Sequence, residues 1–402
     1  MKYLISVLVI FFAFNASAKV EALFHPNGPT LETIAQWISE AQSTVDIAMY
    51  NMDVKESSPI IATLKSAAVQ ARLHSGELKI RVNLELYSSP EANTAKRQAL
   101  EDLGVDVRYL DNKDVKIHHK FAVIDANGPL PRVVTSSANW AVMSQEGYDE
   151  NFLFFTAEKE VTARYQQEFL RLWKASKEFG ATLPSTEQKP VSFVDESDVE
   201  VVFNSPRTIE PQSPEKSMLT DEIVGHINGA KKTLEIATAR IRLVPILEAL
   251  RTAANRGVQV QAVIGQDDFR DLGRRARYLV HKNIQVRIKF YNLDINDFLK
   301  FQMHNKFMIV DGETLIAGSF NWSQSSEFNH IENIVILTGA KAQEVIPAYH
   351  QRFSGIWEMG RDQYASVLAD LEKNQPHQCA LPPMVLTSDE IKELLKYKAD
   401  CK

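Results

Sequence analysis

The sequence predicts an α/β protein in which one unit of alternating strands and helices occurs twice. Short apolar runs of strand length alternate with segments whose apolar residues recur at helical spacing, over residues 20–110 and again over residues 199–290. The same cluster of polar residues follows each series. A duplicated sequence predicts two similar lobes related by a pseudo-twofold axis, each with a mixed sheet flanked by helices.

The first half, residues 19–180, forms the first predicted lobe. Pro59 is favourable in the first turn of a helix, and Gly104 is typical of a helix end. The predicted strands are Val20–Phe24, Val45–Tyr50, Lys79–Leu86, Val105–Leu110 and Phe152–Phe155, and the predicted helices are Leu31–Ala41, Ile60–Val69, Ala92–Leu103 and Val161–Trp173.

The same order recurs after a linker predicted at residues 181–197, where prolines and scattered charges show no periodicity. The second lobe covers residues 198–362, and residues 363–402 form a tail that we expect to pack outside it, with a short helix at Ile391–Tyr397. The predicted strands of this lobe are Val199–Phe203, Leu234–Thr238, Val258–Ile264, Val286–Phe290 and Ile334–Leu337, and its helices are Leu219–Ile227, Ile246–Ala254 and Ala340–Trp357.

Each half also carries the same set of polar residues around two further strands, Phe307–Val310 and Thr314–Ala317 in the second half. The corresponding residues are separated by 182 to 186 positions, and two such copies are a strong signal where one His-x-Lys triplet would be weak. The first set is His118, Lys120, Asp125, Ser137, Asn139 and Glu150, and the second is His304, Lys306, Asp311, Ser319, Asn321 and Glu332.

A histidine and a lysine two positions apart on a strand project from the same face. That face presents an imidazole, which can attack or transfer a proton, beside a permanent cation. The neutral donors Ser319 and Asn321 close the next strand. The combination suits an anionic group on which charge develops at oxygen, which is the requirement of phosphoryl transfer.

These motifs resemble the phospholipase D superfamily, whose mark is two H-x-K-x4-D motifs, each followed by a G-S-x-N-like segment. The resemblance covers nearly all of residues 20–360. The second copy matches fully, with Gly318 before Ser319, whereas Ser136 stands in the first copy where glycine is usual. The resemblance implies a duplicated phospholipase D-like fold with one active site at the interface between the lobes.

The resemblance also implies a two-step reaction at two histidines. One imidazole attacks phosphorus and forms a phosphohistidine, while the other protonates the leaving oxygen and then activates water. We expect His118 to be the nucleophile and His304 the acid, and the reverse assignment is the alternative. His119 points to the opposite face of its strand, so we expect it to be a packing residue.

The other motif residues have supporting roles in the same scheme. Lysines and asparagines would hold the phosphate oxygens, and a glutamate would accept a proton from the far nitrogen of each histidine. The serines either assist or serve turn geometry, and the aspartates at strand-to-turn junctions are expected to be structural. The residues expected to hold the phosphate oxygens are Lys120, Lys306, Asn139 and Asn321. The glutamates are Glu150 and Glu332, the serines Ser137 and Ser319, and the aspartates Asp125 and Asp311.

No metal and no cofactor is implied by these motifs. Two lysines and two asparagines supply the charge and the donors that a cation would otherwise provide. The two cysteines, Cys379 and Cys401, both lie in the tail and form no set with zinc spacing.

Residues 1–18 are predicted to be a signal peptide. Lys2 precedes the apolar stretch Tyr3–Phe14, and Ala16-Ser17-Ala18 is a small-residue cleavage site. A membrane anchor is the alternative, but the apolar run is shorter than the roughly 20 residues that span a bilayer. We therefore expect an exported protein, periplasmic or secreted, in which a disulfide is possible.

The substrate is either phospholipid or nucleic acid. A net charge of −6 favours lipid, whereas the locally basic segment 240–300 could follow a phosphate backbone, rest on a membrane surface, or simply be solvated. Phe298, Leu299 and Phe301 could line an entrance for acyl chains or fill the core. Our hypothesis is a monomeric phospholipase D that hydrolyses head groups; a nuclease is the alternative, and both histidines argue against a non-catalytic binding protein.

Overall fold

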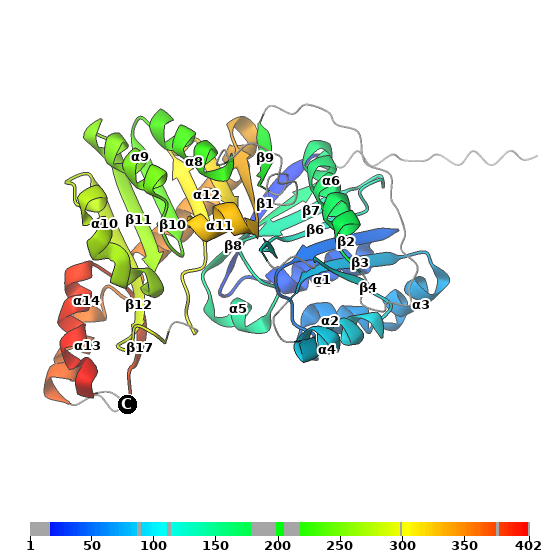
Figure 1. Cartoon of the computed structure of the whole chain (residues 1–402), viewed down its shortest axis with the longest axis horizontal. Helices are drawn as coiled ribbons and strands as arrows, with labels where there is room; N and C mark the ends of the chain where they lie inside the picture. Colours follow the sequence, from blue (N-terminus) through cyan, green and yellow to red (C-terminus); the bar gives the residue numbers. More distant parts are fainter. Residues whose placement is uncertain are drawn as a thin grey trace, which may run out of the picture.

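The computed structural model describes residues 17–86, 90–110, 114–177, 198–204, 218–297, 300–374 and 378–400. Within these ranges the chain forms two lobes that lie side by side, each built on a mixed sheet (Figure 1). The predicted linker, Cys401 and nearly all of the predicted signal peptide lie outside the described residues.

The first lobe contains a seven-stranded sheet in the order β1-β8-β7-β6-β2-β3-β4. Strands β2, β3 and β4 are parallel to one another, and β6, β7, β8 and β1 pair antiparallel. The strands are β1 (Lys19–His25), β2 (Thr44–Met49), β3 (Lys79–Glu85), β4 (Asp106–Leu110), β6 (Lys120–Ile124), β7 (Arg132–Ser136) and β8 (Glu150–Thr156), and the helices are α1 (Thr30–Glu40), α2 (Pro59–Leu64), α3 (Ala67–Ser75), α4 (Pro90–Glu101), α5 (Val142–Gly147) and α6 (Lys159–Ala175).

The second sheet has eight strands in the order β17-β12-β11-β10-β13-β14-β16-β9, which repeats the first sheet and adds β17 at one edge. The duplication predicted from the sequence is therefore a duplication of the fold. The strands are β9 (Val199–Phe203), β10 (Thr233–Thr238), β11 (Gln259–Gly265), β12 (Ile284–Asn292), β13 (Lys306–Val310), β14 (Thr314–Gly318), β16 (Asn333–Leu337) and β17 (Ala380–Leu386), and the helices are α8 (Met218–Gly229), α9 (Val244–Asn255), η1 (Gln266–Asp271), α10 (Leu272–Leu279), α11 (Gln324–Asn329), α12 (Gly339–Trp357), α13 (Tyr364–Lys373), α14 (Ser388–Leu394) and η2 (Leu395–Asp400).

Two sequence predictions about single elements need correction. The helix predicted at Ile60–Val69 is two helices, because the Ser66 hydroxyl accepts a hydrogen bond from the Val69 amide and so begins α3. The tail does not only pack outside the second lobe: its β17 pairs with β12. Pro382 and Pro383 lie in this strand, and an edge strand tolerates proline because one of its sides needs no ladder hydrogen bonds.

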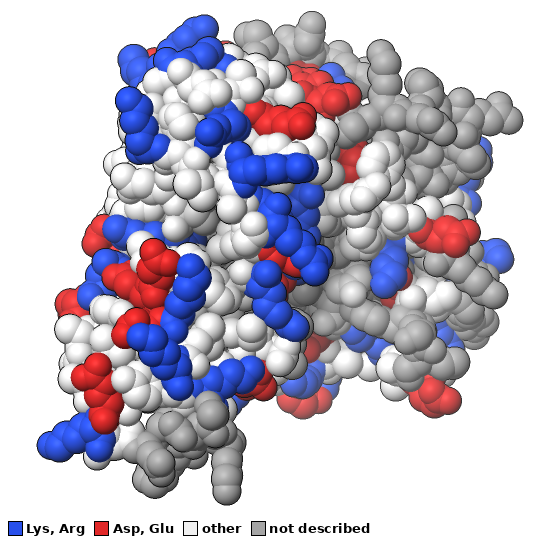
Figure 2. Space-filling view, turned by 60° about the vertical axis from the view of Figure 1, so that its left-hand side comes forward, with Lys and Arg blue, Asp and Glu red and all other residues white. Residues whose placement is uncertain are grey.

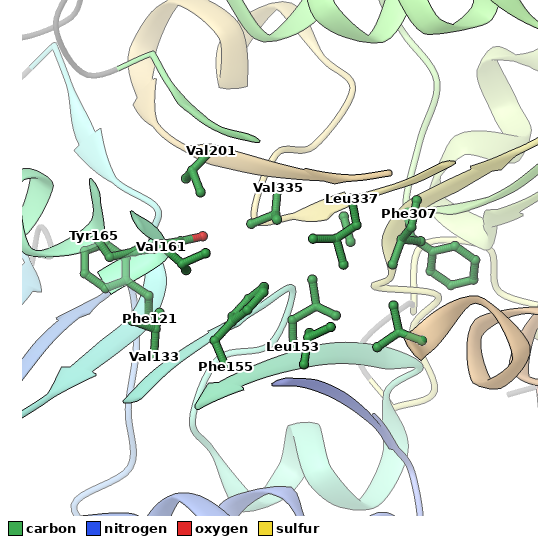
Figure 3. Packing of buried hydrophobic residues seen from close by; sticks show 14 of the residues in the cluster. Phe121, Val133, Leu153, Phe155, Val161, Tyr165, Val201, Phe307, Val335 and Leu337 are labelled. Atoms are coloured by element: carbon green, nitrogen blue, oxygen red, sulfur yellow. The ribbon is translucent and has the colours of Figure 1, made fainter. Parts of the chain in front are cut away.

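The two lobes share one hydrophobic core at their interface (Figure 3). In this view Leu153 and Phe155 of β8 lie opposite Val335 and Leu337 of β16. All four side chains are buried. Since burial of apolar area is the main favourable term in such an interface, we infer that the lobes hold a fixed orientation.

Buried polar pairs at this interface follow the pseudo-twofold relationship. The Asn151 side chain donates to the Tyr349 hydroxyl at 3.2 Å, and the equivalent Asn333 side chain donates to the Tyr165 hydroxyl at 2.7 Å. Each pair joins a residue of one lobe to a helix of the other, α12 or α6. Paired amides and hydroxyls fix the register of the interface, which apolar contacts alone do not.

Two further features concern the chain as a whole. Among the described helices, none has the length and apolar character needed to cross a membrane. Cys379 is disulfide-bonded, and the other cysteine of the chain lies outside the described residues.

Candidate active site

The segments that carry the two motif histidines cross from one lobe to the other. The His304 amide donates to the Asp149 carbonyl at 3.0 Å, and the His118 amide donates to the Ile331 carbonyl at 3.0 Å. A short parallel ladder between β5 (Lys116–Ile117) and β15 (His330–Ile331) continues the second contact. Each histidine therefore lies just before its own strand and against the other lobe.

This crossing pairs each histidine with the glutamate of the opposite motif. Nδ1 of His304 lies 2.7 Å from Oε1 of Glu150, and Nδ1 of His118 lies 2.8 Å from Oε1 of Glu332. All four residues lie at the interface, and both glutamates are fully buried. A carboxylate at Nδ1 retains the proton there, so the lone pair of the neutral ring is at Nε2.

The two pairs have different surroundings. Glu150 also accepts hydrogen bonds from the hydroxyls of Ser137, at 2.5 Å, and Ser144, at 3.0 Å. Ser319, the counterpart of Ser137, instead contacts the Asn333 side chain at 3.3 Å. Within the described ranges, neither oxygen of Glu332 makes an aligned hydrogen bond. The site is therefore asymmetric although the fold is duplicated.

The motif lysines lie beside the histidines and are buried. Nζ of Lys120 donates to the His118 carbonyl, and Nζ of Lys306 to the His304 carbonyl, each at 2.7 Å. Burial lowers the pKa of Lys120 to about 8 and that of Lys306 to about 7. Two cations that are poorly solvated in the free protein favour an anionic ligand between the lobes.

Burial also sets the protonation of the histidines and glutamates. It lowers the pKa of His118 to about 3 and that of His304 to about 4, against the attraction of the paired glutamates. For Glu150 burial acts to raise the pKa, but His304 and Lys306 outweigh it and hold the pKa at about 2. The free site therefore contains neutral imidazoles and ionised carboxylates at neutral pH.

The asparagines that follow the motifs come just after β7 and β14, the strands that pair with the lysine-bearing β6 and β13. The side-chain oxygens of Asn139 and Asn321 are buried and have no hydrogen-bond partner in the described part of the chain. These amide groups are available to a bound molecule. In addition, Nζ of Lys306 lies 3.5 Å from the Ser137 carbonyl, so the segment of one lobe that carries Asn139 reaches the lysine of the other.

The motif aspartates lie elsewhere, at the ends of β6 and β13 away from the lysines. Asp125 accepts from the amides of residues 42–44 at 2.6 to 3.0 Å. Asp311 accepts from the amides of residues 231–233 at 2.6 to 2.9 Å. Both residues have positive φ, 50° and 56°. Asp125 therefore holds the turn before β2, and Asp311 holds the turn before β10. Both roles are structural, and neither carboxylate lies beside a motif histidine.

Sequence reasoning missed three rings at the site, of which the Tyr50 ring lies 4.8 Å from the His118 ring. The His330 ring lies 5.2 Å from the His118 ring, and the Tyr148 ring lies 6.0 Å from the His304 ring. Both precede a motif glutamate by two residues, and this shared position was the signal that could have found them. His119 lies on the opposite face of its segment, 2.9 Å from Glu168.

The basic segment is less available than its sequence indicates. Arg275 is buried, and its guanidinium lies 2.5 Å from Asp268 and 3.4 Å from Asp271. On the surface of this lobe, Asp and Glu side chains lie among the Lys and Arg side chains (Figure 2). Of the predicted basic residues around this helix, Arg270, Arg274 and Arg277 remain exposed.

A small cavity lies beside His304 and is lined by Arg240, Asp267 and Tyr291. Arg240 and Asp267 form an ion pair at 2.9 Å. Phe301 is partly exposed near this entrance, with its ring 5.8 Å from that of Tyr291. The other two residues of the predicted apolar entrance, Phe298 and Leu299, lie outside the described residues.

The fold and the site define a duplicated α/β protein in which two His-x-Lys motifs lie at the interface between the lobes. The sequence profile of the family described as "Cardiolipin synthase, PLD-like domain" matches residues 34–173 and 223–357, which are most of both lobes. The chain belongs to this phospholipase D-like family.

Several curated relatives match one lobe-sized segment. A mitochondrial cardiolipin hydrolase of Danio rerio is 36% identical over 136 residues, which are 34% of this chain and 56% of the relative. A phospholipase D of Rickettsia conorii is 25% identical over 134 residues, 33% of this chain and 62% of the relative. The chain thus spans a little over half the length of these curated relatives.

Solved structures show the same fold over both lobes. A phosphatidylserine synthase of Haemophilus influenzae has a TM-score of 0.63 at 12% identity and covers 95% of this chain and 93% of its own. A polyphosphate kinase of Porphyromonas gingivalis has a TM-score of 0.55 at 17% identity and covers 82% of this chain and 46% of its own. At these identities the similarity concerns the fold alone.

Proposed function

We propose that this protein is an exported phospholipase D-type phosphodiesterase that hydrolyses phospholipid head groups through a phosphohistidine intermediate. The observation that carries the proposal is the pair of crossed contacts, His304 with Glu150 and His118 with Glu332. They place two imidazoles and two buried lysines at one interface. Relatives named cardiolipin hydrolase and phospholipase D favour a lipid substrate.

In the first step, Nε2 of neutral His118 attacks phosphorus and forms a P–N bond as the P–O bond to the leaving alcohol breaks. His304 gives its Nε2 proton to that alcohol. Burial keeps the pKa of His304 low in the free protein, at about 4. The negative charge of a bound phosphodiester favours the imidazolium, so substrate binding supplies the protonated acid.

In the second step, neutral His304 accepts a proton from water as the water oxygen attacks phosphorus and the P–N bond breaks. Lys120 and Lys306 balance the charge on the phosphate oxygens in both steps. Glu332 and Glu150 stabilise the positive charge that each ring carries in turn. All of these roles need only groups that the chain itself supplies.

A phospholipid fits the surroundings of the site better than a nucleic acid. Phe301 is 37% exposed three residues before His304, and Met143 on α5 is 60% exposed. Exposed apolar side chains beside a site favour contact with a lipid surface. A nuclease remains the second candidate because Arg270, Arg274 and Arg277 are exposed on one short segment.

The proposal is tested by comparing substrates with one preparation of the mature protein. We expect head-group release from phosphatidylcholine or cardiolipin vesicles. With radiolabelled lipid, quenching without acid should also trap a labelled phosphoenzyme, and this phosphoenzyme should be stable in alkali and labile in acid. Single-stranded DNA is the competing substrate. Cleavage of DNA without any release of head groups would identify the nuclease instead. Mass spectrometry of the exported protein tests whether its chain begins at Lys19.

A further inference from the structure

A second histidine stands beside the His118–Glu332 pair. Nδ1 of His330 lies 3.7 Å from the same carboxylate oxygen, Oε1 of Glu332, that lies 2.8 Å from Nδ1 of His118. One ligand atom from each of the three residues falls within 4.8 Å of the others. Two imidazoles and one carboxylate are a common ligand set for zinc.

The three residues have binding capacity that other hydrogen bonds do not use. Glu332 is fully buried, and within the described residues neither of its oxygens makes an aligned hydrogen bond, nor does Nδ1 of His118. The contact between the two is therefore close but poorly directed. Besides its contact with Glu332, the His330 ring makes two long contacts of 3.4 Å, to the hydroxyls of Ser325 and Ser326.

The other half of the site provides an internal comparison. There Glu150 is bound by the hydroxyls of Ser137 and Ser144, and its contact with His304 is an aligned hydrogen bond of 2.7 Å. Tyr148 occupies the position that His330 has in the second half. A tyrosine is a poor zinc ligand at neutral pH, so only one half carries the three-ligand set.

We propose that His118, His330 and Glu332 form an inhibitory site for Zn²⁺ or a similar divalent transition ion. Zinc bonds of about 2.0–2.2 Å place tetrahedral ligands about 3.3 Å apart, so small side-chain rotations from the present separations suffice. The His330 side chain, 20% exposed, provides the route of entry.

The chemistry of the imidazole explains why the ion would inhibit. A neutral imidazole has one lone pair. Zinc at Nδ1 of His118 takes the place of the proton held there and leaves the ring proton at Nε2. That nitrogen then has no lone pair with which to attack phosphorus. Inhibition rests on the proposed phosphodiesterase function, whereas zinc binding does not.

The nearby ammonium of Lys120, whose Nζ donates to the His118 carbonyl at 2.7 Å, opposes a bound cation. We therefore expect affinity in the micromolar range, well below that of a structural zinc site. Mg²⁺ and Ca²⁺ prefer sets of oxygen ligands, so they should neither bind here nor inhibit.

The experiment measures zinc binding and inhibition separately in the full mature chain. Zinc is titrated against a chelating indicator, and head-group release is followed at each free zinc concentration. His330→Tyr copies the residue of the first half. His350→Tyr is the matched control, because His350 is an exposed histidine that lies 2.9 Å from Glu235.

We expect one zinc per wild-type chain, with inhibition at the same concentrations. His330→Tyr should weaken zinc binding by at least 10-fold and raise the inhibiting zinc concentration by the same factor, measured against the zinc-free rate of that variant, and His350→Tyr should change neither. If His330→Tyr unfolds, His330→Gln serves instead. Equal zinc affinity in wild type and a folded His330 variant, or no binding at all, would overturn the proposal. If the wild type hydrolyses no lipid, the binding titration still shows whether His330 belongs to a zinc site.

Discussion

Oε1 of Glu150 lies 2.7 Å from Nδ1 of His304, although the two residues belong to different lobes. The reciprocal contact joins Glu332 to His118 at 2.8 Å. Each lobe therefore supplies a histidine to the site and the carboxylate that orients the histidine of the other lobe. Loss of a carboxylate in one lobe should affect chemistry at the ring of the other.

Glu150→Gln and Glu332→Gln should each lower head-group release by about 100-fold, because the neutral amide no longer stabilises a charged imidazole. The NMR signal that shifts in Glu150→Gln should be that of His304. Glu235→Gln is the control, since Glu235 pairs with the exposed His350 away from the motifs. A shift confined to His118 in Glu150→Gln would contradict the crossed pairing.

His118→Asn and His304→Asn should each abolish turnover while the chain stays folded. In the proposed reaction, one imidazole attacks phosphorus and later leaves it, and the other acts first as acid and then as base. Loss of His304 should matter less for a substrate whose leaving group is already acidic, and that difference would identify it as the acid. Circular dichroism and head-group release are the measurements, and near-wild-type turnover in either variant would exclude the shared site.

Asp311→Ala should destabilise the protein by about 1–2 kcal/mol, because three backbone amides lose their acceptor. Burial acts to raise the pKa of this carboxyl, but those amides outweigh it and hold the pKa below its usual value. A carboxyl whose pKa is lower in the folded than in the unfolded state stabilises the folded protein at pH values above the unfolded pKa of about 3.9. This stabilisation disappears as the pH falls through the folded-state pKa.

The difference in unfolding free energy between wild type and Asp311→Ala should therefore shrink below about pH 4. Urea unfolding at pH 7 and at pH 3 measures it, with the exposed Asp389→Ala as a control. A large loss of turnover in folded Asp311→Ala would show that this residue acts in the reaction after all.

Excess chelator should leave head-group release intact. In the proposed reaction two lysines and two amides of the motifs hold the phosphate, and no step is assigned to a metal. Assays before and after exhaustive chelation give the comparison. Activity that disappears on chelation and returns with added divalent ion would reject the mechanism. A rise in activity on chelation agrees with the inhibitory site at His330.

Neutralising Arg270, Arg274 and Arg277 together should leave hydrolysis of zwitterionic vesicles unchanged and slow that of anionic vesicles. Arg275 is kept, because it is buried against Asp268 and its loss would remove one of the two arginines that pair with that buried carboxylate. If nucleic acid is the substrate, the same variant should bind it more weakly and with a smaller salt dependence. That outcome, without lipid hydrolysis by the wild type, would favour the nuclease.

The sequence by itself determined the duplication, most strands and helices, and the two sets of polar residues from which the candidate site is drawn. Strand and helix periods are local properties, so apolar spacing was sufficient to place most elements. The polar sets around His118 and His304 recur with nearly constant separation, which needs no coordinates to detect. Apolar spacing did not predict the helix cap at Ser66, which begins α3, or the pairing of β17 with the edge of the second sheet.

Only the tertiary structure decided which residues meet. Glu150 and His304 are 154 positions apart, and their contact depends on how the two sheets pack. Burial of Arg275 and the approach of His330 to Glu332 arise in the same way. The physical reason is that pairing and desolvation depend on neighbours from distant segments, whereas the spacing of residues along the chain reports only the face on which each side chain lies.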